Sequence, residues 1–372
     1  MTLKHRVALA VRRIFLGKLN QPQQCNIGID DPQPEVRVWL HGIGAARDVT
    51  FTHSIACAAP FTICIGGGVW PCDRTPGERL ALQFHERGGE KRLLAELALR
   101  HTTSILTKGP ALHLFQVESC KNYCLPKGRL WAHYLHLAYL QSRSTSHVRM
   151  SACEAHAMIA AFICPRPVVL VSAVSGDRSN LFPMNLLGSL GDGYFAFALD
   201  STRLAAPLVA AAGTVVLSTI PMEHSEVARQ LGKNHKKESI SWNQLPFSTR
   251  PSTACGIPVP CFASRVIEMQ VETTRNLGSH TFFVARVIRD ERRSDGQQFF
   301  MIHGIYQSWR LANHQESNAP APQSRFHSLT RTDNPHSPVP RTDGCPILRP
   351  ANLAPKRIQQ KIGAFIYSSL RQ

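Results

Sequence analysis

The stretch of sequence that decides the fold begins Pro165-Arg-Pro-Val-Val-Leu-Val-Ser172 and continues through Gly176-Asp-Arg-Ser-Asn180-Leu-Phe-Pro-Met-Asn185. Its first part alternates, is rich in Val, and is followed by turn residues, which is typical of a strand that enters a hairpin. One helical run, His224–Leu231, interrupts the stretch beyond it. The other runs there are strand-like, namely Tyr194–Leu199, Thr214–Thr219, Ser264–Glu272, Thr281–Arg289 and Gln298–His303. So many short strands predict an antiparallel barrel or sandwich.

The chain before this stretch has a mixed texture, which predicts an α/β segment over residues 35–150. Val36–Leu40 and Phe61–Ile65 have the pattern of strands. Apolar residues recur at helical spacing in Glu78–Arg100 and in Gly128–Ser142, so both are predicted to be helices. A basic segment, residues 1–34, comes first. No known chemistry is indicated for any of these residues.

Composition bounds the class of protein. The chain has 372 residues, of which 43% are hydrophobic, as expected of a globular protein. Its formal charge of +17 favours polyanionic partners, or else belongs to solvated surfaces and tails. Residues 313–372 are rich in Pro, Ser and Arg without hydrophobic periodicity, which predicts a disordered basic tail. Eleven cysteines without repeated C-x-x-C pairs, and no apolar run of membrane-spanning length, favour a cytoplasmic protein.

Further short motifs follow the opening stretch in a fixed order. They are Ala198-Leu-Asp-Ser201-Thr202-Arg203, Gly213-Thr-Val-Val-Leu-Ser218, Leu231-Gly-Lys233-Asn-His235, Gly278-Ser-His280-Thr and Ile302-His-Gly304-Ile-Tyr306. In this order and spacing, residues from about 165 to 310 resemble the FMN-binding split-barrel family of flavin reductases. The resemblance implies that residues 151–312 form a mainly β domain with some helix. The expected domain is a six-stranded antiparallel Greek-key split barrel, usually a homodimer with FMN at or near the subunit interface.

The resemblance also implies site residues. Hydroxyls, a guanidinium and further donors would hold the FMN phosphate, supplied by Ser201, Thr202, Arg203, Lys233 and His235. Short polar side chains would meet the isoalloxazine edge, supplied by Ser172, Asn180 and Asn185. His280 would lie near the flavin and the nicotinamide. The structural alternatives are a solvated loop arginine, ordinary turn asparagines and a turn histidine.

The reaction implied is NAD(P)H:flavin reduction, with NAD(P)H as co-substrate and the reduced flavin passing to a partner oxygenase. Because the cofactor carries the hydride chemistry, no side-chain triad or carboxylate pair is required, and none is evident. One alternative is a split-barrel flavoprotein that reduces another substrate. A second, from a different class, is a basic nucleic-acid-binding protein, against which stands the lack of any recognised nucleic-acid-binding motif.

Two side features of the first 150 residues have a functional and a structural interpretation. Cys120 and Cys124 are spaced like two metal ligands on a helix, with His113 and His133 nearby, or they are ordinary core and surface cysteines. The predicted helix Gly128–Ser142 either faces a polyanion or packs on the barrel. The second interpretation is the simpler one in both cases, so we predict no metal site.

Overall fold

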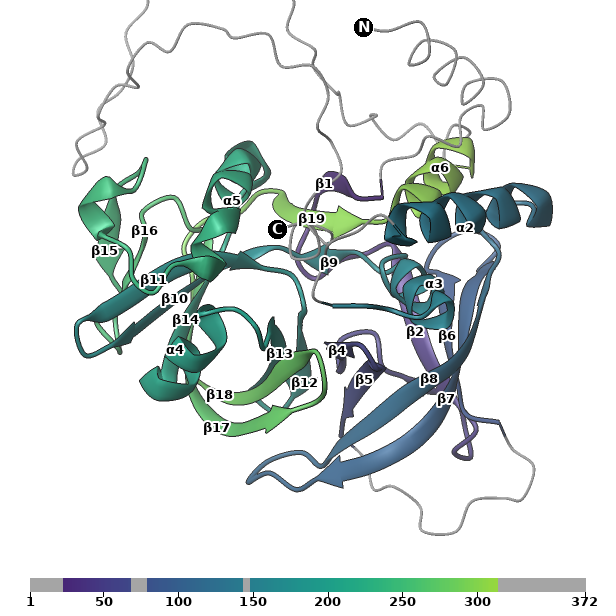
Figure 1. The fold of residues 1–372 in the computed structure, drawn as a ribbon, viewed down its shortest axis with the longest axis horizontal. Helices are drawn as coiled ribbons and strands as arrows, with labels where there is room; N and C mark the ends of the chain where they lie inside the picture. Colours follow the sequence, from purple (N-terminus) through teal and green to yellow (C-terminus); the bar gives the residue numbers. More distant parts are fainter. Residues whose placement is uncertain (1–22, 68–78, 143–147, 314–372) are drawn as a thin grey trace, which may run out of the picture.

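A computed structural model describes residues 23–67, 79–142 and 148–313 (Figure 1). Two predicted segments, the basic residues before 23 and the tail after Asn313, lie outside the described residues. The described chain is mainly β with a few helices, as predicted from the sequence. Two seven-stranded antiparallel sheets make up most of it, one from each half of the chain.

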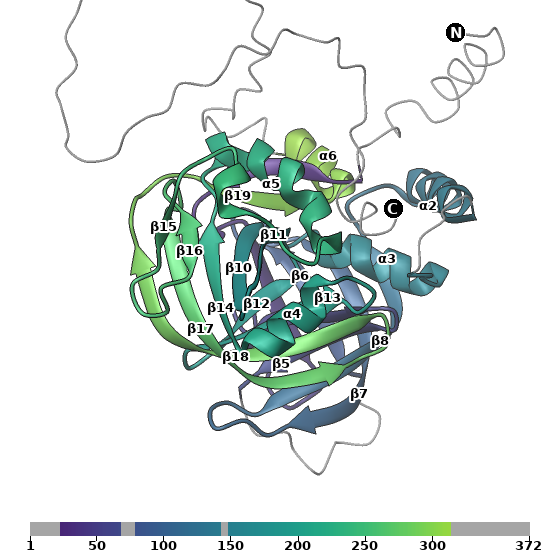
Figure 2. The same ribbon diagram turned by 60° about the vertical axis from the view of Figure 1, so that its left-hand side comes forward.

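The second sheet contains the stretch with which the sequence analysis began. Its strand order is β11-β10-β14-β17-β18-β13-β12. The bounds are β10 (Val169–Ser175), β11 (Arg178–Met184), β12 (Leu187–Gly191), β13 (Tyr194–Asp200), β14 (Thr214–Thr219), β17 (Arg265–Asn276) and β18 (His280–Arg292). The sheet curls around a core of aliphatic and aromatic side chains that includes Val171, Phe197 and Phe283. Helix α4 (Ala205–Ala212) lies against β10, β11, β13 and β14 and closes this core (Figure 2).

A long connection between β14 and β17 lies outside the curled sheet. It contains η2 (Met222–His224), α5 (Ser225–Leu231), η3 (Gly232–Lys236), η4 (Trp242–Gln244), and the paired strands β15 (Thr249–Pro251) and β16 (Pro258–Pro260). Segment η3 packs on β11 and on α4. The helix predicted at His224–Leu231 is therefore confirmed, and it brings the following residues next to the second sheet.

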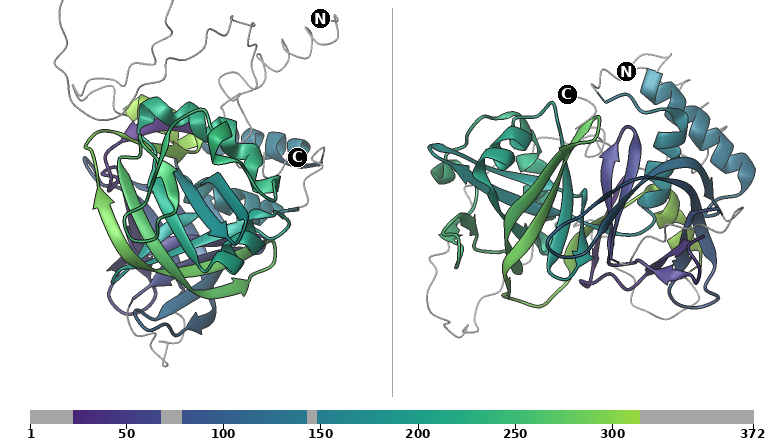
Figure 3. Two further views of the ribbon diagram at one scale, coloured as in Figure 1. Left: turned by 90° about the vertical axis from the view of Figure 1, so that its left-hand side faces the viewer. Right: turned by 90° about the horizontal axis from the view of Figure 1, so that it is seen from below.

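The first sheet lies beside the second (Figure 3) and has the order β3-β2-β6-β7-β8-β5-β4. Its strands are β2 (Val36–His41), β3 (Arg47–Asp48), β4 (His53–Ala58), β5 (Phe61–Gly66), β6 (Ala81–Glu86), β7 (Leu93–Ile105) and β8 (Leu112–Asn122). Strand β6 alternates between half-buried and buried residues, and β7 follows after the Gly88-Gly89 turn. The helix predicted at Glu78–Arg100 is therefore wrong, because an alternating period of two and a double-glycine turn outweigh an approximate helical spacing.

The two sheets have the same topology. The strands correspond one to one in chain order. The seven strands β2 to β8 of the first sheet take the same positions as the seven strands of the second sheet, which are β10, β11, β12, β13, β14, β17 and β18. The irregularities also match, because β7–β8 shifts register at Ala98/Leu99 and at His101/Thr103, and β17–β18 shifts at the equivalent rungs. The hairpins β4–β5 and β12–β13 each carry one register shift at the same place. The chain therefore contains two structural repeats, and the expected α/β extension consists of a curled β sheet followed by a helix.

Smaller elements join the repeats. Strand β19 (Gln298–Ile302) pairs with β1 (Cys25–Ile29) on one side and with β9 (Arg166–Pro167) on the other. Helices α2 (Lys127–Ser142) and α3 (Ala152–Ala161) connect the two sheets, and α6 (Gly304–Asn313) follows β19. Because β1 pairs with β19, part of the segment predicted as residues 1–34 belongs to the folded core. The predicted helix at Gly128–Ser142 is confirmed.

The strand count of each repeat is seven, whereas the resemblance implies six. The additional strand in the second repeat is β12, whose sequence Leu-Gly-Ser-Leu-Gly has a weak strand signal because glycine is disfavoured in strands. It is paired along one side by β13. The split-barrel character, a curled antiparallel sheet closed by a helix, is otherwise as expected.

Candidate functional site

Asp200, the last residue of β13, is the centre of the loop in which phosphate ligands were predicted. Its Oδ1 accepts hydrogen bonds from the backbone N–H and the hydroxyl of Thr202, at 2.9 and 2.7 Å. Its Oδ2 accepts one from Nε of Arg203 at 3.1 Å, and both side chains of this ion pair are more than nine-tenths buried. An aspartate that binds the residue two positions later is a common turn former. Asp200 therefore holds the loop in shape, and sequence reasoning overlooked it.

The loop leads directly into helix α4, whose N-terminus has no side-chain cap. The first N–H groups of a helix have no partner within the helix, so an uncapped N-terminus attracts an anion. Thr202 and Leu204 are exposed there, and Ser201 is half-buried with its hydroxyl 3.1 Å from that of Thr281. Lys233 is exposed on η3, which packs against α4. Hydroxyls and backbone donors thus meet at the N-terminus of α4, and η3, which carries Lys233, packs against the same helix.

His280 begins β18 and pairs with Asp200 across the ladder between β13 and β18. The imidazole is buried, and its Nδ1 lies 2.8 Å from the Ser279 hydroxyl. The backbone N–H of Ala58, in the first repeat, points at the same Nδ1 at 3.5 Å. With donors directed at Nδ1, the neutral ring carries its proton on Nε2. His280 is therefore arranged as a hydrogen-bond donor beside the Asp200 loop.

Ser279 connects this histidine to the first repeat. Its hydroxyl accepts from the Ala59 N–H at 3.0 Å, and its own N–H donates to the Ala59 carbonyl at 2.9 Å. The thiol of Cys57 lies 3.4 Å from the same hydroxyl. A Cβ at Gly278 would come within 2.6 Å of the Ala59 oxygen, so glycine permits this approach. The turn between β4 and β5 is thus packed directly on the residues that position His280.

Two of the predicted ligands have structural partners. His235 lies on Phe182, and its Nε2 donates to the carbonyl of Pro183 at 2.7 Å. Asn180 is fully buried, and its amide donates to the carbonyls of Asn234 and Lys237. The structure therefore places Asn180 as the anchor of the η3 segment. The ring N–H of His235 donates to Pro183, so it is not available for the FMN phosphate for which it was predicted.

The remaining two predicted residues lie on or beside the β10–β11 hairpin. Ser172 is fully buried on β10, and its hydroxyl has no hydrogen-bond partner among the described residues. In the sheet order β14, β17 and β18 separate β10 from β13, the strand of Asp200. Asn185 follows β11, and its amide donates to the sulfur of Met301 at 3.4 Å. The flavin-edge role predicted for these residues stays a prediction.

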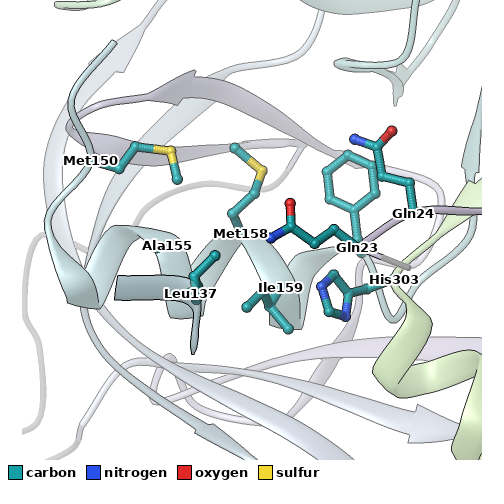
Figure 4. Close-up of a pocket in the computed structure, with 9 residues that line it drawn as sticks. Gln23, Gln24, Leu137, Met150, Ala155, Met158, Ile159 and His303 are labelled. Atoms are coloured by element: carbon teal, nitrogen blue, oxygen red, sulfur yellow. The ribbon is translucent and has the colours of Figure 1, made fainter. Parts of the chain in front are cut away.

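Two hollows lie elsewhere in the described chain, and one of them is open and lined by Asp177, Arg178, Lys237, Glu238 and Ser239. A cavity of about 20 Å³ lies among α2, α3 and the residue before α6, and it has room for about one water (Figure 4). Its lining is mainly apolar and includes Met158, Ile159 and His303. Among the described residues no group of three or more His, Cys, Asp or Glu side chains is placed to hold a metal ion. Likewise, none of the described helices is long and apolar enough to cross a membrane.

Comparison with protein families gives one match. Residues 161–310 match the family model described as a flavin reductase like domain. This stretch contains the Asp200 loop, η3 and His280. We call residues 161–310 the flavin reductase-like domain, after the family model that they match. The resemblance found in the sequence motifs is thereby confirmed for this part of the chain.

Solved structures similar to the chain include three that bind or reduce flavins by their descriptions. The FMN-binding protein from Thermus thermophilus with bound 1-cyclohex-2-enone has 21% identity, covers 35% of this chain and 71% of its own, and has a TM-score of 0.32. The styrene monooxygenase flavin reductase from Pseudomonas putida S12 has 18% identity, coverages of 40% and 92%, and a TM-score of 0.33. An NADH:FAD oxidoreductase from Streptomyces globisporus has 16% identity, coverages of 40% and 88%, and a TM-score of 0.36. No curated protein matches the chain.

The flavin reductase-like domain contains donors that fit a flavin mononucleotide. The uncapped N-terminus of α4, the Ser201 hydroxyl and the exposed Lys233 are suited to a phosphate, whereas the Thr202 hydroxyl donates to Asp200. Nε2–H of His280 is a donor of the kind that a flavin or nicotinamide carbonyl accepts. The guanidinium of Arg203 is paired with Asp200 through Nε. It therefore stabilises the loop and also places positive charge in it.

The buried histidines make a testable contribution to acid sensitivity. Burial lowers the pKa of His280, of His235 and of His133 from the usual 6.5 to about 4. As the pH falls from 6.5 towards 4, the unfolded chain takes up protons that the folded chain does not. The stability from these neutral rings is therefore complete above pH 6.5 and is lost as the pH falls towards 4, by up to about 1.4 kcal/mol per pH unit for each ring.

We expect the melting temperature to fall steadily between pH 6.5 and 4. His133→Phe should reduce this slope, because His133 is buried and its ring nitrogens have no hydrogen-bond partner among the described residues. Scanning calorimetry across this range measures both slopes. Equal slopes for the wild type and His133→Phe would contradict the assignment.

Proposed function

We propose that the chain is an FMN-dependent oxidoreductase, an NAD(P)H:flavin reductase that supplies reduced flavin to a partner oxygenase. The observation that carries the proposal is the meeting of an uncapped α4 N-terminus, the Asp200-organised loop and His280 in the part of the chain that is a flavin reductase-like domain. When bound, FMN would accept a hydride from the nicotinamide and pass the electrons on.

The residues of the chain have three tasks in this proposal. The end of α4 with Ser201 and Lys233 holds the phosphate, and Asp200 keeps the loop in place through Thr202 and Arg203. His280 donates from Nε2 to a carbonyl of the flavin or the nicotinamide and so fixes their relative position. Correct placement of donor and acceptor is a large part of the rate of such a transfer.

Arg203→Ala is expected to weaken FMN binding by about 1.5–3 kcal/mol, or roughly tenfold to 150-fold in Kd. The reason is that the variant removes positive charge near the phosphate and frees Asp200 from its partner. Fluorescence titration with FMN measures the change. Arg229→Ala serves as a control, because Arg229 forms an exposed ion pair with Glu226 on α5. Unchanged affinity in Arg203→Ala would remove this residue from the site.

A flavoprotein with a different electron donor or acceptor remains the second candidate, because the family match does not specify the reaction. It shares the FMN site with the first candidate and differs only in whether NADH or NADPH reduces the bound flavin. A chain that bound no flavin at all would leave the basic nucleic-acid-binding protein as the alternative from a different class.

A further inference from the structure

The two repeats meet through a core to which each contributes equivalent residues. The rung Cys64↔Leu114 of the first repeat corresponds to Ala196↔Val284 of the second, and all four side chains are buried together. Leu112 and Phe282 stand at equivalent positions, two residues before Leu114 and Val284, and lie in the same cluster. An interface to which both sides give the same positions has the self-complementary form of a twofold dimer.

The contacts at the two ends of this interface are reciprocal. In the second repeat, the turn before β18 packs on the β4–β5 turn, where the Ser279 N–H donates to the Ala59 carbonyl. In the first repeat, the turn before β8 packs on the start of β13, and a Cβ at Gly109 would lie only 2.1 Å from the ring of Tyr194. Each repeat therefore already occupies the pairing face of the other.

The repeats differ at the features that make up the flavin site. Residues 220–264 join β14 to β17 and carry Lys233, whereas only residues 87–92 join β6 to β7. The ladder between β13 and β18 extends to Asp200↔His280, but the ladder between β5 and β8 ends at Gly66↔Leu112. That last rung is equivalent to Ala198↔Phe282. The residue two positions before Leu112 is Pro110, and the residue two positions before the equivalent Phe282 is His280.

The first repeat nevertheless contributes to the site of the second. The Ala59 N–H donates to the Ser279 hydroxyl, and the Ala58 N–H is directed at Nδ1 of His280. These contacts hold Nδ1 as an acceptor and so leave the proton on Nε2. The β4–β5 turn is a positioning element for His280, supplied from outside the flavin reductase-like domain that contains the histidine.

We propose that the first repeat, residues 36–122, is a second split barrel that takes the place of a partner subunit within the same chain. Its described residues, 36–67 and 79–122, have no counterpart of η3 or of His280. The inference rests on the proposed function for the identity of the ligand. It replaces the homodimer implied by the family resemblance with a single chain that carries one flavin site and completes that site with its own β4–β5 turn.

The mass and the flavin stoichiometry of the full chain test this proposal. Light scattering on the eluted protein should give the mass of one chain, 41.3 kDa, and titration should saturate at one FMN per chain. A mass of two chains, or two FMN per chain, would overturn the inference even if FMN binds. A single-chain mass without FMN binding would overturn the proposed function instead, and the internal pairing would stand.

A matched pair of variants tests the asymmetry between the repeats. Each repeat has a serine hydroxyl 2.8 Å from Nδ1 of a buried histidine, Ser279 with His280 and Ser104 with His113. Ser279→Ala should weaken FMN binding roughly fivefold to tenfold, the effect of one lost hydrogen bond, and Ser279→Thr should restore it. Ser104→Ala should leave the Kd for FMN within twofold. Equal weakening by both alanine variants, or none by Ser279→Ala, would contradict the proposal.

Discussion

The variant His280→Asn is expected to remain folded and to bind FMN with an affinity lowered by about tenfold, while flavin reduction by NADH or NADPH slows by about tenfold to a thousandfold. The neutral ring presents Nε2–H as a donor because Nδ1 accepts from Ser279. An asparagine amide is shorter and does not place a donor at the same point. The loss should therefore appear in the rate of flavin reduction, measured by stopped-flow absorbance.

The matched control is His113→Asn. His113 is also buried, and its Nδ1 is bonded to a serine, but it belongs to the first repeat. Any general cost of replacing a buried histidine in a curled sheet should affect the melting temperature of both variants. If His280→Asn loses stability and flavin together while the reduction rate per bound flavin stays at the wild-type value, the role of His280 is structural.

Asp200→Ala is expected to lower the free energy of unfolding by about 3–5 kcal/mol, the range measured when one partner of a buried ion pair is removed. The buried Arg203 would lose the carboxylate that accepts from its Nε, and the Thr202 N–H and hydroxyl would lose their acceptor. Because the same loop leads into α4, FMN affinity should fall with stability. Denaturant unfolding and FMN titration of the same preparation measure the two effects.

Two variants set the scale for this result. Asp200→Asn keeps an oxygen for Thr202 and should restore part of the stability, although the charge is gone. Glu226→Ala removes the carboxylate of an exposed ion pair and should cost at most about 1 kcal/mol. A loss in Asp200→Ala no larger than that in Glu226→Ala would show that the Asp200–Arg203 pair does not organise the loop.

The strands of the second repeat could be predicted from the sequence, and those of the first only in part. Val169 to Val174 form a Val-rich apolar run that is almost wholly buried and is followed by turn residues, a pattern typical of a buried strand. In Glu78–Arg100 the leucines fit a helical spacing almost as well as an alternating one. The decision between them comes from pairing with β2 and β8, which are contacts between residues distant in sequence.

The internal repeat could not be predicted from the sequence, because it is not carried by similar residues. Cys64 in the first repeat is equivalent to Ala196 in the second, and Leu114 is equivalent to Val284. The two members of each pair share only an apolar character. What the repeats share is strand order and the position of register shifts, and neither is visible without the backbone. The contribution of Ala58 and Ala59 to the site is hidden for the same reason, since it depends on backbone N–H groups.

The role of Asp200 in the loop could have been predicted from the sequence. An aspartate two residues before a threonine at the start of a helix is a pattern with a known local hydrogen bond. Arg203 lies in the same loop, and its partner there is this aspartate. The burial of the pair is set by the packing of α4 on the sheet, which sequence periodicity does not reveal.

The central claim is that bound FMN is reduced by a nicotinamide nucleotide. Anaerobic mixing of the FMN-loaded chain with NADH and with NADPH, followed at the visible absorption band of the flavin, tests it most directly. The account predicts that at least one nucleotide bleaches the band and that admission of oxygen restores it. A folded, FMN-loaded protein that neither nucleotide bleaches would contradict the reductase assignment.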